Sequence, residues 1–117
     1  MIILFKIPSP KNYISEDSKS IGKNYALQIY NETFDYLKSR YCADLVNPQL
    51  VESYAQMMAR HIQLESLLSQ SGFIVKHPTT GEPIPSPLAK MSLDYLNQAN
   101  SIWNKINKVI EDYSCLE

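Results

Sequence analysis

The chain has 117 residues, enough for one domain with a modest hydrophobic core and too few for a separate catalytic domain beside it. Hydrophobic residues make up 44% and charged residues 20%, which is typical of a globular protein and argues against disorder. The formal net charge of −1 excludes a strong overall attraction to nucleic acid or to an anionic membrane. Any contact with DNA must therefore come from a local patch or from many copies.

We expect residues 1–20 to form an N-terminal arm and linker, ahead of a helical domain over residues 21–117. The opening MIILFKI is apolar but short and is followed by Pro8, which favours a strand or arm over a signal peptide or membrane span. It could pack on the core of its own chain or on a neighbouring subunit. Cys42 and Cys115 lack disulfide-framework or metal-ligand spacing, which favours a reducing, cytoplasmic location.

The first helix is predicted over residues 21–41, because its apolar residues recur with helical spacing. One row of this face contains Ile21, Tyr25, Ile29 and Tyr36, and the adjacent row contains Ala26, Tyr30, Phe34 and Leu37. Tyrosines could also stack on nucleic-acid bases. At this spacing they favour a core in which the hydroxyls reach the rim.

The second helix is predicted over residues 48–70, with Asn47 as N-cap and Pro48 at the first helical position. Its buried face contains Leu50, Val51, Tyr54, Ala55, Met58, Ile62 and Leu68. Its solvent face is expected to contain Gln49, Glu52, Ser53, Gln56, Arg60 and Gln63. The short connection at residues 42–46 makes the two helices neighbours, as a hairpin or a helix-turn-helix-like corner.

A short, irregular β-ribbon is predicted between the second and third helices. Gly72 is expected to close the second helix in the left-handed conformation, with an apolar contact between Leu68 and Phe73. Residues 73–76 and 82–87 are the two extended pieces, and the turn Thr79-Thr80-Gly81 joins them. The prolines at 83, 85 and 87 place all their missing N–H groups on one side, so only the other side of this piece can pair.

The third helix is predicted over residues 87–113, with Ser86 as N-cap. Its apolar stripe contains Leu88, Ala89, Ser92, Tyr95, Leu96, Ala99, Ile102, Trp103, Ile106, Val109, Ile110 and Tyr113. The opposite face is rich in amides and contains Asn97, Gln98, Asn100, Ser101, Asn104, Lys105, Asn107 and Lys108. This face fits solvated surface, a subunit interface or contacts with phosphates. The fold class is therefore mainly α, with three long amphipathic helices and a proline-rich ribbon.

The sequence contains no nucleotide-binding, nucleophile-elbow or metal-ligand motif, so we expect a protein without enzymatic activity, metal or cofactor. His61 and Glu65 lie one turn apart and could form half of a metal or acid–base site. The second half is missing, and such a pair is more often plain surface electrostatics. His77 lies in the proline loop, away from that pair in sequence.

The segment LVNPQLVESYA at residues 45–55, followed by Arg60, Gly72-Phe73, HPTTGEP at residues 77–83 and Ser86-Pro87-Leu88, resembles the small terminase subunits of tailed phages and prophages. The resemblance extends from about Tyr25 to Tyr113. It implies a non-catalytic, ring-forming subunit that binds viral double-stranded DNA and presents it to the large subunit, which carries the ATPase and nuclease.

The basic residues are the candidates for the DNA contact that this resemblance implies. They form one group around the first helix and a second group on the third: Lys11, Lys19, Lys23, Lys38 and Arg40, with Lys105 and Lys108. Two alternatives stay open. One is a helical assembly module of a phage without direct DNA contact, which the net charge favours. The other is a helix-turn-helix regulator, although the start of the second helix offers little basic character.

Overall fold

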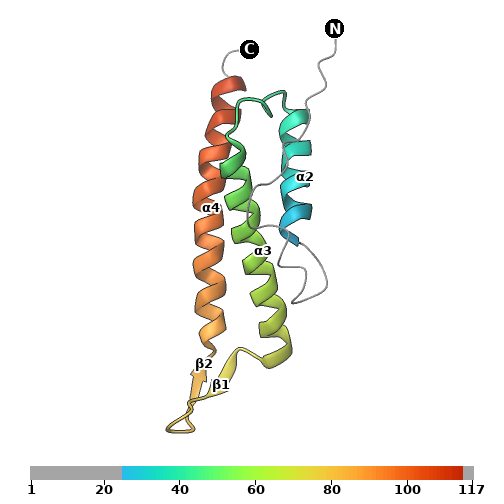
Figure 1. The fold of residues 1–117 in the computed structure, drawn as a ribbon. Helices are drawn as coiled ribbons and strands as arrows, with labels where there is room; N and C mark the ends of the chain where they lie inside the picture. Colours follow the sequence, from blue (N-terminus) through green and yellow to red (C-terminus); the bar gives the residue numbers. More distant parts are fainter. Residues whose placement is uncertain (1–24, 115–117) are drawn as a thin grey trace.

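The computed structural model describes residues 25–114, and this part of the chain is mainly α-helical, as predicted (Figure 1). It contains helices α2 (Tyr25–Ser39), α3 (Pro48–Ser71) and α4 (Pro87–Ser114), and strands β1 (Ile74–Lys76) and β2 (Pro83–Pro85). The second and third predicted helices are correct to within one residue at each end. The first ends two residues earlier than predicted. The expected arm and linker over residues 1–20 lie outside the described residues.

The three helices lie side by side, with α3 between α2 and α4 (Figure 1). Helices α3 and α4 run antiparallel along most of their length, and the shorter α2 packs against the first half of α3. The ribbon of β1 and β2 joins α3 to α4 and projects beyond the helices at one end of the molecule. The connection between α2 and α3 lies at the opposite end.

The core lies where α2 and α4 meet α3. The predicted row of α2 is fully buried, and it comprises Ala26, Tyr30, Phe34 and Leu37. The rings of Tyr30 and Phe34 meet edge to face, with centroids 5.0 Å apart. From α3 and α4 the core takes Val51, Ala55, Ala59, Ala99, Ile106 and Ile110. The alanines among them are small enough for the helix backbones to approach closely.

Helix α2 ends in a Schellman motif centred on Tyr41. The Tyr41 backbone has φ 59°, in the left-handed region that usually requires glycine. The N–H of Tyr41 donates to the carbonyl of Lys38 at 3.0 Å, and the N–H of Cys42 donates to that of Leu37 at 3.1 Å. Both Leu37 and Cys42 are fully buried, which supplies the apolar contact typical of this motif. Burial raises the pKa of the Cys42 thiol, with Arg40 opposing and Asp44 adding to the shift.

Helix α3 begins as predicted and ends differently. The Asn47 side chain accepts a hydrogen bond from the N–H of Gln49 at 2.9 Å, and Pro48 is the first helical residue. At the other end, Gly72 has the predicted positive φ of 88°, but its ψ of 158° is extended, not left-handed helical. The chain therefore leaves the helix directly in the direction of β1. The sequence predicts an apolar contact between Leu68 and Phe73 at this cap. Leu68 is buried, but Phe73 is 62% exposed, so the cap does not bury the phenylalanine ring.

The ribbon confirms the predicted proline edge. Strands β1 and β2 pair antiparallel, with Val75 opposite Ile84. Pro83 and Pro85 flank Ile84, so their nitrogen atoms face away from β1, where no N–H is needed. The outer side of β2 therefore offers no donors to a further strand.

Hydrogen bonds at both ends of the ribbon fix its register. The N–H of Ser86 donates to the carbonyl of Phe73, and the N–H of His77 donates to that of Glu82, both at 2.8 Å. Ser86 also caps α4 as predicted, because its hydroxyl accepts from the N–H of Leu88 at 3.2 Å. The ribbon is thus joined to α4 without a flexible linker.

Part of the predicted solvent face of α3 is wrong. Glu52, Gln56 and Gln63 are only 8%, 7% and 8% exposed. Burial raises the pKa of the Tyr30 phenol on α2, and the charge of Glu52 adds to this rise, so Glu52 lies beside that helix. Helix α3 has neighbours on two sides, and its buried surface is wider than its apolar stripe.

Candidate functional site

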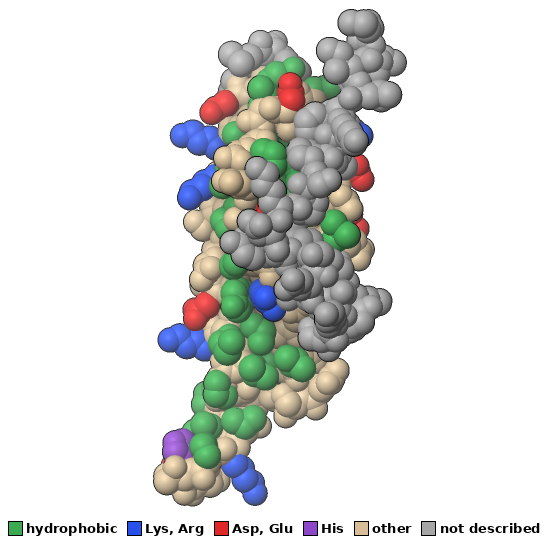
Figure 2. All heavy atoms as spheres, in the orientation of Figure 1, with side chains coloured by type: hydrophobic (Ala, Val, Ile, Leu, Met, Phe, Trp, Pro, Cys, Tyr) green, Lys and Arg blue, Asp and Glu red, His purple; other side chains and the backbone are tan. Residues whose placement is uncertain are grey.

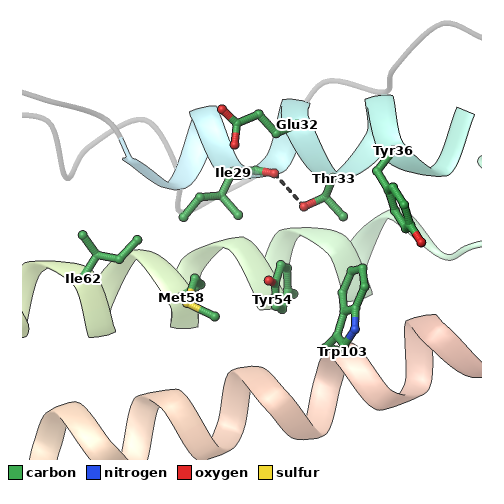
Figure 3. A pocket seen from close by; sticks show the side chains of 8 residues that line it. All are labelled: Ile29, Glu32, Thr33, Tyr36, Tyr54, Met58, Ile62 and Trp103. Atoms are coloured by element: carbon green, nitrogen blue, oxygen red, sulfur yellow. Dashed lines mark hydrogen bonds between the residues drawn. The ribbon is translucent and has the colours of Figure 1, made fainter. Parts of the chain in front are cut away.

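An open groove of about 320 Å³ runs along α3 between the two outer helices (Figure 3). Its floor is the ridge formed by Tyr54, Met58 and Ile62, which are four residues apart and lie on one face of α3. Helix α2 supplies Ile29, Glu32, Thr33 and Tyr36, and α4 supplies Trp103. The groove forms because α2 and α4 both pack on α3 and leave its ridge between them partly open.

Three aromatic rings from three different helices meet at one end of the groove. The Trp103 ring lies between those of Tyr54 and Tyr36, with centroid separations of 5.2 Å and 6.1 Å. Figure 3 shows the indole reaching from α4 across the edge of α3 toward Tyr36. Burial raises the pKa of the Tyr54 phenol, which is half-buried in this cluster. The rings offer flat apolar surfaces that suit proline and other aliphatic side chains.

Among the described residues that line the groove, Glu32 is the charged one. Its carboxylate accepts a hydrogen bond from Gln28 at 3.1 Å and is exposed at the rim. The Thr33 hydroxyl donates to the carbonyl of Ile29 at 2.7 Å, so this polar group is already satisfied within α2. The groove is therefore suited to an apolar segment that also carries a positive charge.

His61 and Glu65 form a hydrogen-bonded cluster with Ser92, not the plain surface pair expected from their spacing. The Ser92 hydroxyl donates to the Glu65 carboxylate at 2.7 Å. His61 Nδ1 lies 2.9 Å from this hydroxyl and 3.1 Å from the Ser92 carbonyl, so Nδ1 carries a proton and donates to both oxygens. The cluster joins α3 to α4.

The geometry of this cluster indicates a structural role for Ser92 and not a nucleophilic one. A nucleophilic serine donates its proton to the histidine, whereas here the Ser92 hydroxyl donates to a carboxylate. Ser92 is also only 1% exposed, so no substrate reaches it. The cluster satisfies a buried hydroxyl and fixes the position of α4 along α3.

His77 holds the turn of the ribbon. Its Nδ1 accepts hydrogen bonds from the N–H groups of Thr79 and Thr80, at 3.1 and 3.2 Å. The carbonyl of His77 accepts from Gly81 at 2.9 Å, which closes the predicted turn. Within the described residues, no group of three or more His, Cys, Asp and Glu side chains is arranged to hold a metal ion.

The described basic candidates all lie at one end of the molecule. Lys38 and Arg40 are exposed at the end of α2, and Lys105 and Lys108 are exposed near the end of α4, which lies beside it (Figure 1). Lys11, Lys19 and Lys23 lie outside the described residues. The structure thus places two groups that are far apart in sequence at the same end of the molecule.

Acidic residues accompany both basic groups. Asp35 and Asp44 flank the pair on α2, and Glu111 and Asp112 follow the pair on α4. All four of these carboxylates are exposed. One copy therefore presents a mixed surface at this end, and its attraction for a polyanion is weak.

The sequence pattern did not reveal the groove or the serine cluster. Both combine residues from helices that meet only after folding, such as Ser92 with His61 on the neighbouring helix. A polar residue within the apolar stripe of α4 was the one available signal, because a buried hydroxyl requires a partner. For Trp103, the stripe indicated burial but not which rings it would contact.

These features define a small helical module with an aromatic groove and a projecting ribbon. The sequence profile of the phage terminase small subunit matches residues 26–111, and the chain therefore belongs to this family, whose role is in DNA packaging. Neither a curated protein nor a solved structure matches the chain. None of the helices in the described part of the chain has both the length and the apolar character needed to cross a bilayer.

Proposed function

We propose that this protein is a non-catalytic DNA-packaging adaptor that binds viral double-stranded DNA and recruits the large ATPase-nuclease subunit. Family membership is the observation that carries the proposal. The helical fold with exposed surfaces at both ends is compatible with an adaptor that contacts several partners. The proposed setting is the cytoplasm of the bacterial host, and the proposed division is an arm over residues 1–20 and a helical domain over residues 21–117.

The DNA contact is assigned to the end of the molecule that carries Lys38, Arg40, Lys105 and Lys108, with Lys11, Lys19 and Lys23 as further contributors. A homo-oligomer, in the form of a ring, would place many copies of this end around one duplex. The contribution of each phosphate contact is then summed over the copies, which compensates for the acidic residues beside each pair.

Binding to a fluorescent DNA duplex at increasing salt tests this assignment. We expect Lys105→Glu/Lys108→Glu to weaken binding and to flatten the dependence of affinity on salt, since each lost phosphate contact lowers the slope of log K against log salt by about 0.9. Lys90→Glu is the matched control, because Lys90 is exposed on the same helix about 22 Å away, at 1.5 Å per residue. Equal effects of the two variants would refute the assignment.

The second candidate function is a helical assembly module that has no direct contact with DNA. The acidic residues beside both basic groups and the net charge of −1 favour it. It predicts that the protein binds the large subunit but shows no salt-sensitive DNA binding, even when concentrated and at low salt. The DNA titration separates the two functions, and co-purification with the large subunit shows that the protein used in it is active in assembly.

A further inference from the structure

One face of the ribbon is an exposed apolar surface with one positive charge. Ile74 and Lys76 alternate along β1, and the register pairs them with Pro85 and Pro83. Paired and alternate residues share a face of an antiparallel ribbon, so these four side chains point to the same side. All four are exposed, and we call them the ribbon knob. Figure 2 shows hydrophobic side chains exposed along the ribbon and the adjoining end of the helices.

The ribbon knob matches the groove in two independent ways. Two prolines on a backbone edge without donors fit an aromatic-lined groove, where Tyr36, Tyr54 and Trp103 provide the rings. The cation of the knob, Lys76, is opposite in charge to Glu32, the charged residue among the described residues that line the groove. The ribbon knob and the groove of this chain are therefore complementary in apolar character and in charge.

The ribbon knob cannot reach the groove of its own molecule. Ile62, the groove residue nearest the ribbon along α3, lies nine residues before the end of the helix, about 14 Å at 1.5 Å per residue. Beyond that point the ribbon continues away from the helices (Figure 1). The hydrogen bonds from Ser86 to Phe73 and from Gly72 to Leu68 hold it in that direction.

We propose that the ribbon knob of one copy docks into the groove of a second copy of this chain. Because the two surfaces differ, the contact is head-to-tail, and each molecule uses its knob on one neighbour and its groove on the other. Such heterologous contacts form rings when the rotation between copies closes. The inference deepens the proposed function, since it names the surfaces through which the adaptor would assemble.

The first test compares two equally simple substitutions by native mass spectrometry and sedimentation. Ile74→Asp places a carboxylate in the apolar knob and lowers the positive charge of the knob that faces Glu32. We expect it to weaken each contact about tenfold, as for loss of a buried isoleucine side chain. Leu45→Asp is the control, because Leu45 is similarly exposed, at 52% against 62%, but lies in the α2–α3 connection outside both surfaces. Circular dichroism and urea unfolding confirm that both variants fold.

The second test exchanges the charges. Glu32→Lys and Lys76→Glu each bring like charges together, so each variant alone should associate less than the unmodified protein. When the two variants are mixed, every groove meets a knob of opposite charge only if the two variants alternate. We therefore expect assembly to return in the mixture, with equal amounts of the two chains. High salt should reduce both the loss and the recovery.

The outcomes separate this inference from the proposed function. A chain that is monomeric at all concentrations, or assembles equally well with Ile74→Asp, overturns the docking of knob into groove. Failure of the charge-exchange mixture to recover also contradicts the pairing of Lys76 with Glu32. The DNA contact of the Lys105 and Lys108 group is tested separately, because the salt titration compares lysine variants in which the knob and the groove are unchanged.

Discussion

Ser92 shows how one buried hydroxyl sets the position of two helices. It lies at the centre of the cluster, because its hydroxyl is hydrogen-bonded to both His61 and Glu65 and its carbonyl also accepts from His61. Its carbonyl would still accept from His61 after removal of the hydroxyl, but Glu65 would lose its donor. Removal of the hydroxyl should therefore lower the free energy of unfolding by the contribution of its own hydrogen bonds, while the bond to the carbonyl remains.

We expect Ser92→Ala to lower the free energy of unfolding by about 1 to 2 kcal/mol, the usual net contribution of the hydrogen bonds that are lost with the hydroxyl, one of which goes to a carboxylate. Urea unfolding measures this value. Ser101→Ala on the exposed face of the same helix is the control and should change stability by less than about 0.5 kcal/mol. Equal effects at both positions would show that the cluster adds nothing to the packing of α4.

The Tyr54 phenol makes stability depend on alkaline pH. Burial raises its pKa above the ordinary value of 10.0, so the folded state favours the neutral phenol. The contribution is fully present below pH 10 and is lost as the pH rises through 10 and then through the folded-state pKa. We expect Tyr54→Phe to reduce this alkaline loss in urea unfolding between pH 8 and 11.

The element boundaries follow from local chemistry where a cap is involved. Helices α3 and α4 start as predicted, at Asn47-Pro48 and Ser86-Pro87. In each pair the first side chain accepts a hydrogen bond from an N–H of the first turn, and the proline lacks an N–H that would have no partner there. The proline edge of β2 was predictable for the same reason. Each depends only on residues that are neighbours in sequence.

Features that depend on packing could not be read in this way. Glu52 and Gln63 have the polarity of surface residues, yet α3 lies between two helices and buries them. The groove needs residues from α2, α3 and α4 in one place, and the position of Lys38 and Lys105 at the same end of the molecule depends on the whole topology. Periodicity identifies which face of a helix is buried but not the partner that covers it.

The end of α2 carries an unusual residue for its conformation. Tyr41 has a positive φ, which costs a side-chain-bearing residue about 1 to 2 kcal/mol, and its own side chain is 76% exposed. We expect Tyr41→Gly to stabilise the fold by about 0.5 to 1 kcal/mol, after allowance for the greater freedom of glycine in the unfolded chain. Thermal and urea unfolding check this. A loss of stability would mean that the tyrosine ring contributes contacts that outweigh the strain.

The described part of the chain has two different ends, with the ribbon at one and the candidate DNA-binding residues Lys38, Arg40, Lys105 and Lys108 at the other. In the proposed assembly, self-association and DNA contact therefore use separate surfaces. We expect Ile74→Asp to weaken DNA binding although it removes no positive charge, because fewer copies act together. Lys105→Glu/Lys108→Glu should leave the assembled mass unchanged. A DNA titration and native mass spectrometry on the same samples test both statements, and a change of mass with the lysine variant would contradict them.

Trp103 is the single tryptophan of the chain, and it lies in the groove wall. The protein consequently contains its own optical reporter of groove occupancy, which excitation at the red edge of tryptophan absorption selects over the eight tyrosines. When a docked ribbon removes water from the indole, its emission should move to shorter wavelength as protein concentration rises. Ile74→Asp should move this shift to higher protein concentration and Leu45→Asp should leave it unchanged, so assembly can be followed in solution without a chemical label.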